Sequence, residues 1–203
     1  MIAALFVENG GPYYGLPDVD PWDIERDARK YDGPWTVVAH PPCSRWCQLA
    51  HIKQRRYGLR VGDDGGCFDA ALAAVRKWGG VLEHPAFSYA WPAFGLPMPE
   101  RRGWMRTLFD PGWVCQVSQA AYGHQARKLT WLYCISPNRP RMDWRRPAAS
   151  VSDMGRNRLV VSAQVSFCGN HGNSRLPRLS KRAAARTPIA FRDVLIEIAR
   201  GAK

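Results

Sequence analysis

The chain of 203 residues contains no long apolar run. A membrane-spanning helix needs roughly 20 consecutive apolar residues, and no stretch of this sequence approaches that length. The opening stretch MIAALFV is too short for a signal peptide and is followed at once by Glu8. We therefore expect a soluble, cytoplasmic protein with no membrane partner.

Cysteine is scarce as well, with six residues in the whole chain. Secreted proteins that are held together by disulfides are usually shorter and denser in cysteine. We expect reduced thiols in a cytosol. Hydrophobic residues make up 46% of the chain, which is enough for one sizeable buried core.

Acidic residues are few in the second half of the chain. Residues 1–100 hold 10 Lys or Arg and 12 Asp or Glu, whereas residues 101–203 hold 19 and 5. A charge distribution of this kind is typical of proteins that bind a polyanion such as nucleic acid. The alternative is a solvated basic face that only aids solubility.

Hydrophobic patterning and turn residues predict alternating strands and helices. Strands are expected at 3–7, 35–40, 81–84, 113–119 and 129–135, and helices at 20–34, 67–78 and 187–200. Asp20 would cap the first helix, with Ile24, Ala28 and Tyr31 on its inner face. Residues 46–66 form a long basic loop in this interpretation, and within 136–186 only 158–167 has an ordered pattern.

This alternation predicts an α/β fold with a mainly parallel sheet. In such sheets the chemistry lies at the carboxyl ends of the strands. Glu8, Cys43 and Glu83 each fall at the expected end of a strand. They are the first candidates for site residues.

Cys43 stands in the stretch VVAHPPCSRWC, just after two prolines that end a strand. A proline pair fixes two φ angles and holds the next side chain in a defined direction, as a nucleophile requires. We expect the basic loop that follows, with Arg45 close by, to lower the pKa of this thiol. An inert buried thiol is one alternative. A zinc site using His40, Cys43 and Cys47, or Cys168 and His171, is another.

Three further motifs follow in order along the chain: Glu83-His84-Pro85, then Tyr122-Gly123, then Gln125 with Arg127. Together with Pro42-Cys43 they resemble the signatures of the DNA cytosine-5 methyltransferases, in a reduced, phage-type form. The opening stretch ALFVENGGPYYG is similar to the loop with which that family cradles S-adenosylmethionine; the matching positions are Leu5, Phe6, Gly10, Gly11 and Gly15.

The resemblance implies a Rossmann-like sheet with a shortened cofactor lobe, because fewer than 30 residues separate Gly15 from Cys43. It implies a catalytic core at 1–135, a short basic insertion at 136–186 in place of a target-recognition domain, and a C-terminal helix at 187–203 that returns to the core. The cofactor implied is S-adenosylmethionine, and the residues that would hold it are Phe6, Glu8, Gly10, Gly11 and Asp20.

The resemblance also implies roles for individual residues. The Cys43 thiolate would add to carbon 6 of a pyrimidine, Glu83 would hold the N3 edge of the base, and Arg127 would neutralise a phosphate or carbonyl or steady the cysteine loop. The partner would be DNA, as a single strand or with a flipped base, or a pyrimidine nucleotide. The expected nucleic-acid contacts are Arg45, Arg145, Arg146, Arg178, Lys181 and Arg182.

Two other interpretations of the same residues stay open. The chain could be a non-catalytic nucleic-acid-binding protein derived from that fold, or it could use the same cysteine chemistry with a different one-carbon donor. Three tryptophans, Trp46, Trp91 and Trp104, are candidates for stacking on bases, and packing is the alternative for each.

Overall fold

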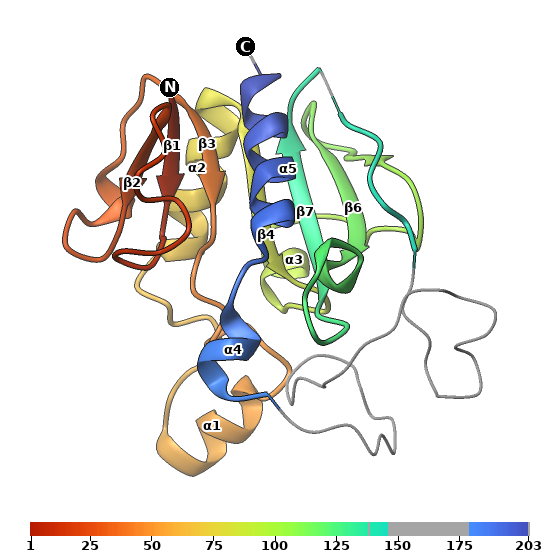
Figure 1. The fold of residues 1–203 in the computed structure, drawn as a ribbon. Coiled ribbons are helices and arrows are strands. Elements are labelled where there is room, and N and C mark those ends of the chain that lie inside the picture. Colours follow the sequence, from red (N-terminus) through yellow and green to blue (C-terminus); the bar gives the residue numbers. More distant parts are fainter. Residues whose placement is uncertain (138, 146–178, 203) are drawn as a thin grey trace.

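The structure, a computed structural model, describes residues 1–137, 139–145 and 179–202. Within these residues one sheet has the strand order β2-β1-β3-β4-β7-β6-β5 (Figure 1). Its strands are β1 (Ile2–Leu5), β2 (Val19–Trp22), β3 (Thr36–Ala39), β4 (Gly80–Pro85), β5 (Met105–Arg106), β6 (Trp113–Ser118) and β7 (Leu129–Ile135).

Strand direction divides the sheet into two parts. Strands β1 to β4 are mutually parallel, β7 pairs antiparallel with both β4 and β6, and β5 pairs antiparallel with β6. The register sets Leu5 beside Ala39, and Ala39 beside Leu82. The loops that follow β1, β3 and β4 therefore leave the same edge of the sheet, which we call the carboxyl edge.

Helices cover both faces of the sheet, which confirms the predicted α/β class. They are η1 (Ala28–Lys30), α1 (Ala50–Tyr57), α2 (Cys67–Trp78), α3 (Ala90–Ala93), η2 (Gln119–Tyr122), α4 (Lys181–Ala185) and α5 (Ile189–Arg200). In Figure 1, α5 crosses in front of the sheet and α2 lies behind it. Each buries an apolar stripe with helical spacing: Phe68, Leu72 and Val75 on α2, and Phe191, Leu195 and Ile198 on α5.

The predicted helix at 20–34 is wrong. Residues 19–22 form the edge strand β2, and only Ala28–Lys30 make a short helical turn. Asp23 accepts hydrogen bonds from the backbone of Glu25 and Arg26, and Asp27 has a left-handed φ of 51°, so the chain turns repeatedly. Ile24, expected on the inner face, is 91% exposed.

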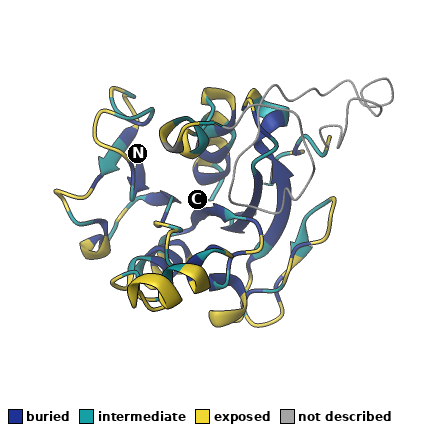
Figure 2. Ribbon diagram, turned by 90° about the horizontal axis from the view of Figure 1, so that it is seen from below, coloured by how far each residue is buried: buried dark blue, intermediate teal, exposed yellow. Residues whose placement is uncertain are grey.

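The predicted loop at 46–66 contains the helix α1, which lies below the carboxyl edge of the sheet together with α4 (Figure 1). Its pattern gave no helical signal because only Ala50 is buried and the other side chains face solvent or lie partly covered. Figure 2, seen from below, shows buried strands surrounded by exposed segments. The predicted strand at 158–167 lies outside the described residues.

The connection from β1 to β2 contains no helix, although the two strands are parallel neighbours. Helix α5 packs instead on β1, β3 and β4, and Arg192 on α5 donates to the carbonyl of Pro12 at 2.7 Å. The C-terminal helix thus fixes the loop that follows β1. In the described part of the chain, no helix has the length and apolar character needed to span a bilayer.

Candidate active site

The fold brings Cys43 and Glu83 to the carboxyl edge of neighbouring strands. Cys43 begins the turn after β3, where its carbonyl accepts from the backbone N–H of Cys47 at 3.0 Å. Glu83 lies in β4 and is 8% exposed, whereas Cys43 is half-buried. The two side chains are close enough for the charge of Glu83 to act on the thiol. This is the arrangement expected for two residues near the carboxyl ends of neighbouring parallel strands.

The carboxylate of Glu83 is held on both oxygens. His40 Nδ1 donates to Oε2 at 3.0 Å, and Gln119 Nε2 donates to Oε1 at 3.1 Å and to Thr130 Oγ1 at 2.9 Å. Burial opposes ionisation of Glu83, but the hydrogen bond and charge of His40, with Lys128 and His84 adding, lower its pKa to about 2. Glu83 is therefore an oriented carboxylate at neutral pH.

Tyr13 completes this network from the loop after β1. Its hydroxyl lies 2.7 Å from His40 Nε2, and the Tyr13 side chain is 2% exposed. Burial raises the pKa of Tyr13 well above its usual value, so the hydroxyl keeps its proton. Tyr13, Gln119 and the pairing of His40 with Glu83 carry no signal in the sequence, since only the folded sheet shows which residues face one another.

The expectation that the thiol of Cys43 has a lowered pKa is wrong for the free protein. Burial, the negative charge of Glu83 and the neighbouring Cys47 raise the pKa of Cys43 to about 11, and Lys128 opposes them only weakly. The basic residues after Cys43 do not reverse this. At neutral pH the resting thiol is protonated and needs an acceptor for its proton before it can act as a nucleophile.

Lys128 is the basic residue whose charge reaches both Glu83 and Cys43. Its ammonium group donates to the carbonyls of Ala185 and Arg186 at 2.9 Å each, which ties the end of α4 to the carboxyl edge. Arg127, the residue singled out by sequence, lies next to it, and its carbonyl accepts from Ser118 Oγ at 2.6 Å. Lys128 therefore joins the candidate site.

The glycine-rich loop after β1 leaves open space at the same edge. Phe6 adopts a left-handed φ of 59°, and Gly10, with φ +64°, has no atom within 4 Å of where a Cβ would lie. At Gly11 a Cβ would meet the carbonyl of Glu8 at 2.7 Å, which requires glycine. Glu8 itself is exposed.

The acidic residues in β2 and directly after it are held by neighbouring residues. Asp20, which lies in β2 and is no helix cap, accepts from Trp22 Nε1 at 2.8 Å and pairs with Arg26. Asp23, at the end of β2, accepts from the Tyr14 hydroxyl at 2.6 Å and from two backbone N–H groups. Both carboxylates therefore already accept hydrogen bonds from neighbouring residues.

Two of the three candidate stacking tryptophans are core residues. Trp46 is 7% exposed and donates to Asp64 Oδ2 at 2.7 Å, and Trp91 is fully buried against Phe68 and His84. Trp104 is half-buried. Packing is therefore the correct interpretation for Trp46 and Trp91.

His84, next to Glu83, is fully buried in this aromatic cluster, with its ring 5.1 Å from Phe68 and 6.3 Å from Trp91. Neither ring nitrogen makes a well-formed hydrogen bond to a described residue, although the backbone of Pro42 favours the charged form slightly. Burial lowers the pKa of His84 to about 4, against the charges of Glu83 and Asp64. The imidazole is therefore neutral in the folded protein at neutral pH.

Acid should destabilise the protein through His84. The unfolded chain binds a proton near pH 6.5, whereas the folded chain binds it only near pH 4, so stability is present above that window and is lost as pH falls through it. Urea unfolding at a series of pH values should show a loss of about 2–3 kcal/mol between these limits. His84→Phe should remove most of this slope, and His51→Phe, at an exposed position, should not. An unchanged slope in His84→Phe would contradict this assignment.

The expected nucleic-acid contacts fall into different surroundings. Arg45 is half-buried, and its Nη1 has no hydrogen-bond partner in the described part of the chain. Arg182 on α4 is exposed, whereas Arg145 is paired with Asp143. Arg146 and Arg178 lie outside the described residues, and the side chain of Lys181 is not described.

A second cluster of arginines lies on the β5 side of the sheet, where residues 139–145 run down beside β6 (Figure 1). Its members, which we call the arginine–tryptophan surface, are Arg102, Arg106, Arg139, Arg141, Trp104, Trp113 and Trp144. Arg139 lies 3.8 Å and Arg106 6.0 Å from the ring centre of Trp113, and Trp104 Nε1 donates to the carbonyl of Pro140 at 3.2 Å. An open hollow is lined by Arg102, Arg141, Trp144 and the paired Asp143 and Arg145.

None of the four arginines of this surface forms an ion pair with a described residue. The 139–145 segment also contacts η2, which carries Gln119, because Asp143 N–H donates to the Tyr122 hydroxyl at 2.8 Å. The basic character of residues 101–203 is evident from the sequence, but the contact between the 101–106 and 139–145 segments is not.

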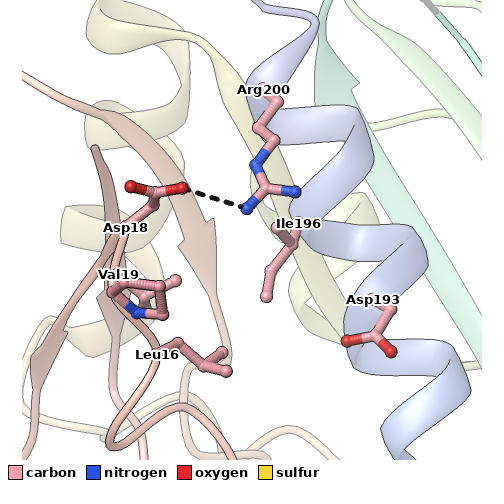
Figure 3. A pocket seen from close by; sticks show the side chains of 7 residues that line it. Leu16, Asp18, Val19, Asp193, Ile196 and Arg200 are labelled. Atoms are coloured by element: carbon pink, nitrogen blue, oxygen red, sulfur yellow. Dashed lines mark hydrogen bonds and ion pairs between the residues drawn. The ribbon is translucent and has the colours of Figure 1, made fainter.

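A further pocket lies at the opposite edge of the sheet, between residues 16–19 and α5 (Figure 3). Asp18 and Arg200 form an ion pair of 3.5 Å beside it, with Asp193 and Ile196 on the same helix. Val19 opens β2, so this pocket lies at the amino ends of the strands, away from Cys43 and Glu83.

No metal site is found in 1–137, 139–145 and 179–202, where no group of three or more His, Cys, Asp or Glu is placed to hold an ion. Cys168 and His171 lie outside the described residues. Comparisons of this chain with protein-family models, with curated proteins and with solved structures found no match.

Proposed function

We propose that this protein is an enzyme that modifies carbon 5 of a pyrimidine base in nucleic acid, with Cys43 as nucleophile and Glu83 as its acid–base partner. The observation that carries the proposal is the meeting of Cys43, Glu83 and Lys128 at the carboxyl edge of the sheet. The order of motifs that resembles the DNA cytosine-5 methyltransferases supports it, and so does the α/β sheet, which we interpret as Rossmann-like with a shortened cofactor lobe.

Modification of carbon 5 requires a thiol nucleophile, a carboxylate that holds the base and a nearby positive charge. Carbon 5 of a pyrimidine is a poor nucleophile until a thiolate adds to carbon 6 and turns the ring into an enamine. Glu83 would hold the N3 edge, and Lys128 with Arg127 would balance the charge of the complex. A base reaches this buried edge only when it is flipped out or single-stranded. Arg45, whose Nη1 lacks a partner among described residues, suits the adjoining phosphate.

The partner we propose is a polymer rather than a free nucleotide. The arginine–tryptophan surface combines four arginines free of ion pairs to described residues with three indole rings, the combination that single-stranded nucleic acid requires. A lone nucleotide would need only one or two of these arginines.

S-adenosylmethionine should bind weakly or not at all. The acids of β2 are occupied by Arg26, Trp22 and Tyr14, and no helix follows β1. Titration calorimetry of the free protein and of its complex with an oligonucleotide measures this. A low-micromolar Kd in either case would contradict the expectation and make methyl transfer from this donor the default reaction.

A second candidate function is nucleic-acid binding without catalysis, which the raised pKa of Cys43 favours. A 5-fluoropyrimidine within an oligonucleotide separates the two, because only a nucleophilic Cys43 becomes covalently linked to it. The Cys43→Ser variant is the control.

A further inference from the structure

Four segments of the chain contribute to one buried line of hydrogen bonds beside Cys43. It runs from Tyr13, after β1, through His40, after β3, to Glu83 in β4 and Gln119 in η2. The side chains of His40 and Glu83 are 13% and 10% exposed. Each of these four side chains has at least one hydrogen-bond partner, as most buried polar groups do in folded proteins.

The direction of the protons along this line follows from the acceptor at its centre. An ionised carboxylate only accepts, so His40 Nδ1 carries the proton that is donated to Glu83. Whenever the imidazole is neutral, Nε2 is therefore the acceptor, and the Tyr13 hydroxyl donates to it. Tyr13 therefore selects the His40 tautomer that can hold Glu83.

Other charged groups also face this line. Lys128 lies close enough to Glu83 for its charge to act on the carboxylate, and His84 follows Glu83 in β4. The thiol of Cys43 lies close enough to Glu83 to be affected by its charge. Arg192 and Asp193, both on α5, act on Tyr13 with opposite signs. Because both oxygens of Glu83 already accept one hydrogen bond, the carboxylate is fixed in direction and keeps a lone pair for a further proton.

We infer that Tyr13 and His40 form a positioning dyad that keeps Glu83 as the oriented carboxylate through which the Cys43 proton passes to the base. The inference rests on the proposed function. In the step, the S–H bond of Cys43 breaks and an S–C6 bond forms. The C5=C6 electrons move to C4=C5, the C4=N3 electrons move to N3, and N3 receives the proton that Glu83 took from sulfur. Glu83 ends as it began, so no further reactant is needed.

The dyad explains how a thiol that rests protonated can act at neutral pH. Glu83 is a weak base, but the basicity of N3 rises as sulfur adds to carbon 6. The proton therefore moves from sulfur through Glu83 to N3. Without a donor at His40, burial would favour the protonated acid at Glu83. A protonated Glu83 could not accept the thiol proton. The dyad is thus required most at mildly acidic pH.

The test compares His40→Phe, which removes the donor to Glu83, with His40→Asn, whose amide can replace the Nδ1–H. Tyr13→Phe is a third variant, which keeps the ring and frees the tautomer. Carbon-13 NMR of the Glu83 carboxyl in the free protein reports its pKa directly. The rate at which carbon 5 of a pyrimidine oligonucleotide exchanges its hydrogen with heavy water, which requires no donor, is followed from pH 5 to 8. Circular dichroism checks that each variant is folded.

In His40→Phe the pKa of Glu83 should rise from about 2 to well above its ordinary 4.5, because burial is no longer offset. The rate of exchange at carbon 5 should fall several-fold at pH 5 and approach the wild-type rate at pH 8, whereas His40→Asn should restore both the pKa and the rate. A purely structural role would lower the rate equally at every pH. Tyr13→Phe should give a smaller shift in the same direction.

The two proposals fail differently. If Glu83 has an unshifted titration in His40→Phe, the positioning dyad is wrong, whatever the enzyme does. If the pKa of Glu83 shifts as expected but wild type catalyses no exchange at carbon 5, the proposed function is wrong and the dyad serves another reaction of the same carboxylate.

Discussion

Incubation with an oligonucleotide that carries a 5-fluoropyrimidine should link the DNA covalently to Cys43. Thiol addition at carbon 6 activates carbon 5, and with fluorine there the proton that must leave after transfer is absent, so the adduct persists. Intact-mass measurement should show one oligonucleotide per chain with a one-carbon donor present. Cys43→Ser should give none.

A second readout of the same prediction needs no donor. While sulfur is bound at carbon 6, carbon 5 is an enamine carbon and exchanges its hydrogen with solvent. In heavy water, wild-type protein should therefore place deuterium on carbon 5 of an ordinary pyrimidine oligonucleotide. Cys47→Ser, at the nearest thiol, is the matched control and should exchange normally. Absence of both adduct and exchange on single-stranded and duplex DNA would rule out Cys43 as the nucleophile.

Replacing Arg102, Arg106, Arg139 and Arg141 by alanine should lower affinity for single-stranded nucleic acid on the order of a thousandfold in about 0.1 M salt. Each phosphate that an arginine neutralises releases condensed counterions, with a slope of log affinity against log salt of about −0.7 per contact on single strands. Loss of four contacts should flatten that slope by about 3. Fluorescence anisotropy across a salt series measures both quantities.

The matched control removes the same charge elsewhere. Arg26, Arg29, Lys77 and Arg200 each pair with a carboxylate that lies in β2 or in the segments on either side of it. Their alanine variant has the same net charge as the test variant. It should bind nearly as wild type does, because β2 lies at the opposite end of the sheet from β5 and its arginines. It should also stay folded, since exposed ion pairs contribute little to stability. Equal losses in the two variants would mean that overall charge, not this surface, attracts the nucleic acid.

The part of the site that sequence could predict is the part set by local pattern. The apolar runs before Cys43 and Glu83 mark buried strands, and parallel strands bring their carboxyl ends together, so the meeting of these two residues was foreseeable. The helix at 67–78 was found at its observed bounds because Phe68, Leu72 and Val75 have helical spacing.

The rest depends on contacts between distant segments. The partnership of Tyr13 with His40 joins residues 27 apart, and that of His40 with Glu83 joins residues 43 apart. The pKa of Cys43 is set by burial and by Glu83, neither of which its own loop reveals. At 20–34, Asp20 before Pro21 looks like a helix N-cap, but Asp20 lies in β2 and accepts a hydrogen bond from Trp22 Nε1.

Helix α5 has a consequence for how the chain folds. It shares a buried cluster with Ile2 and Ala4 of β1, and Phe191, Leu195 and Ile198 supply the other side of that cluster. The first strand therefore cannot complete its packing during synthesis until the last helix has left the ribosome. Contacts of such long sequence separation slow folding, since a large loop must close before they form. Nascent chains should accordingly stay dependent on chaperones until α5 emerges, however early the sheet begins to pair.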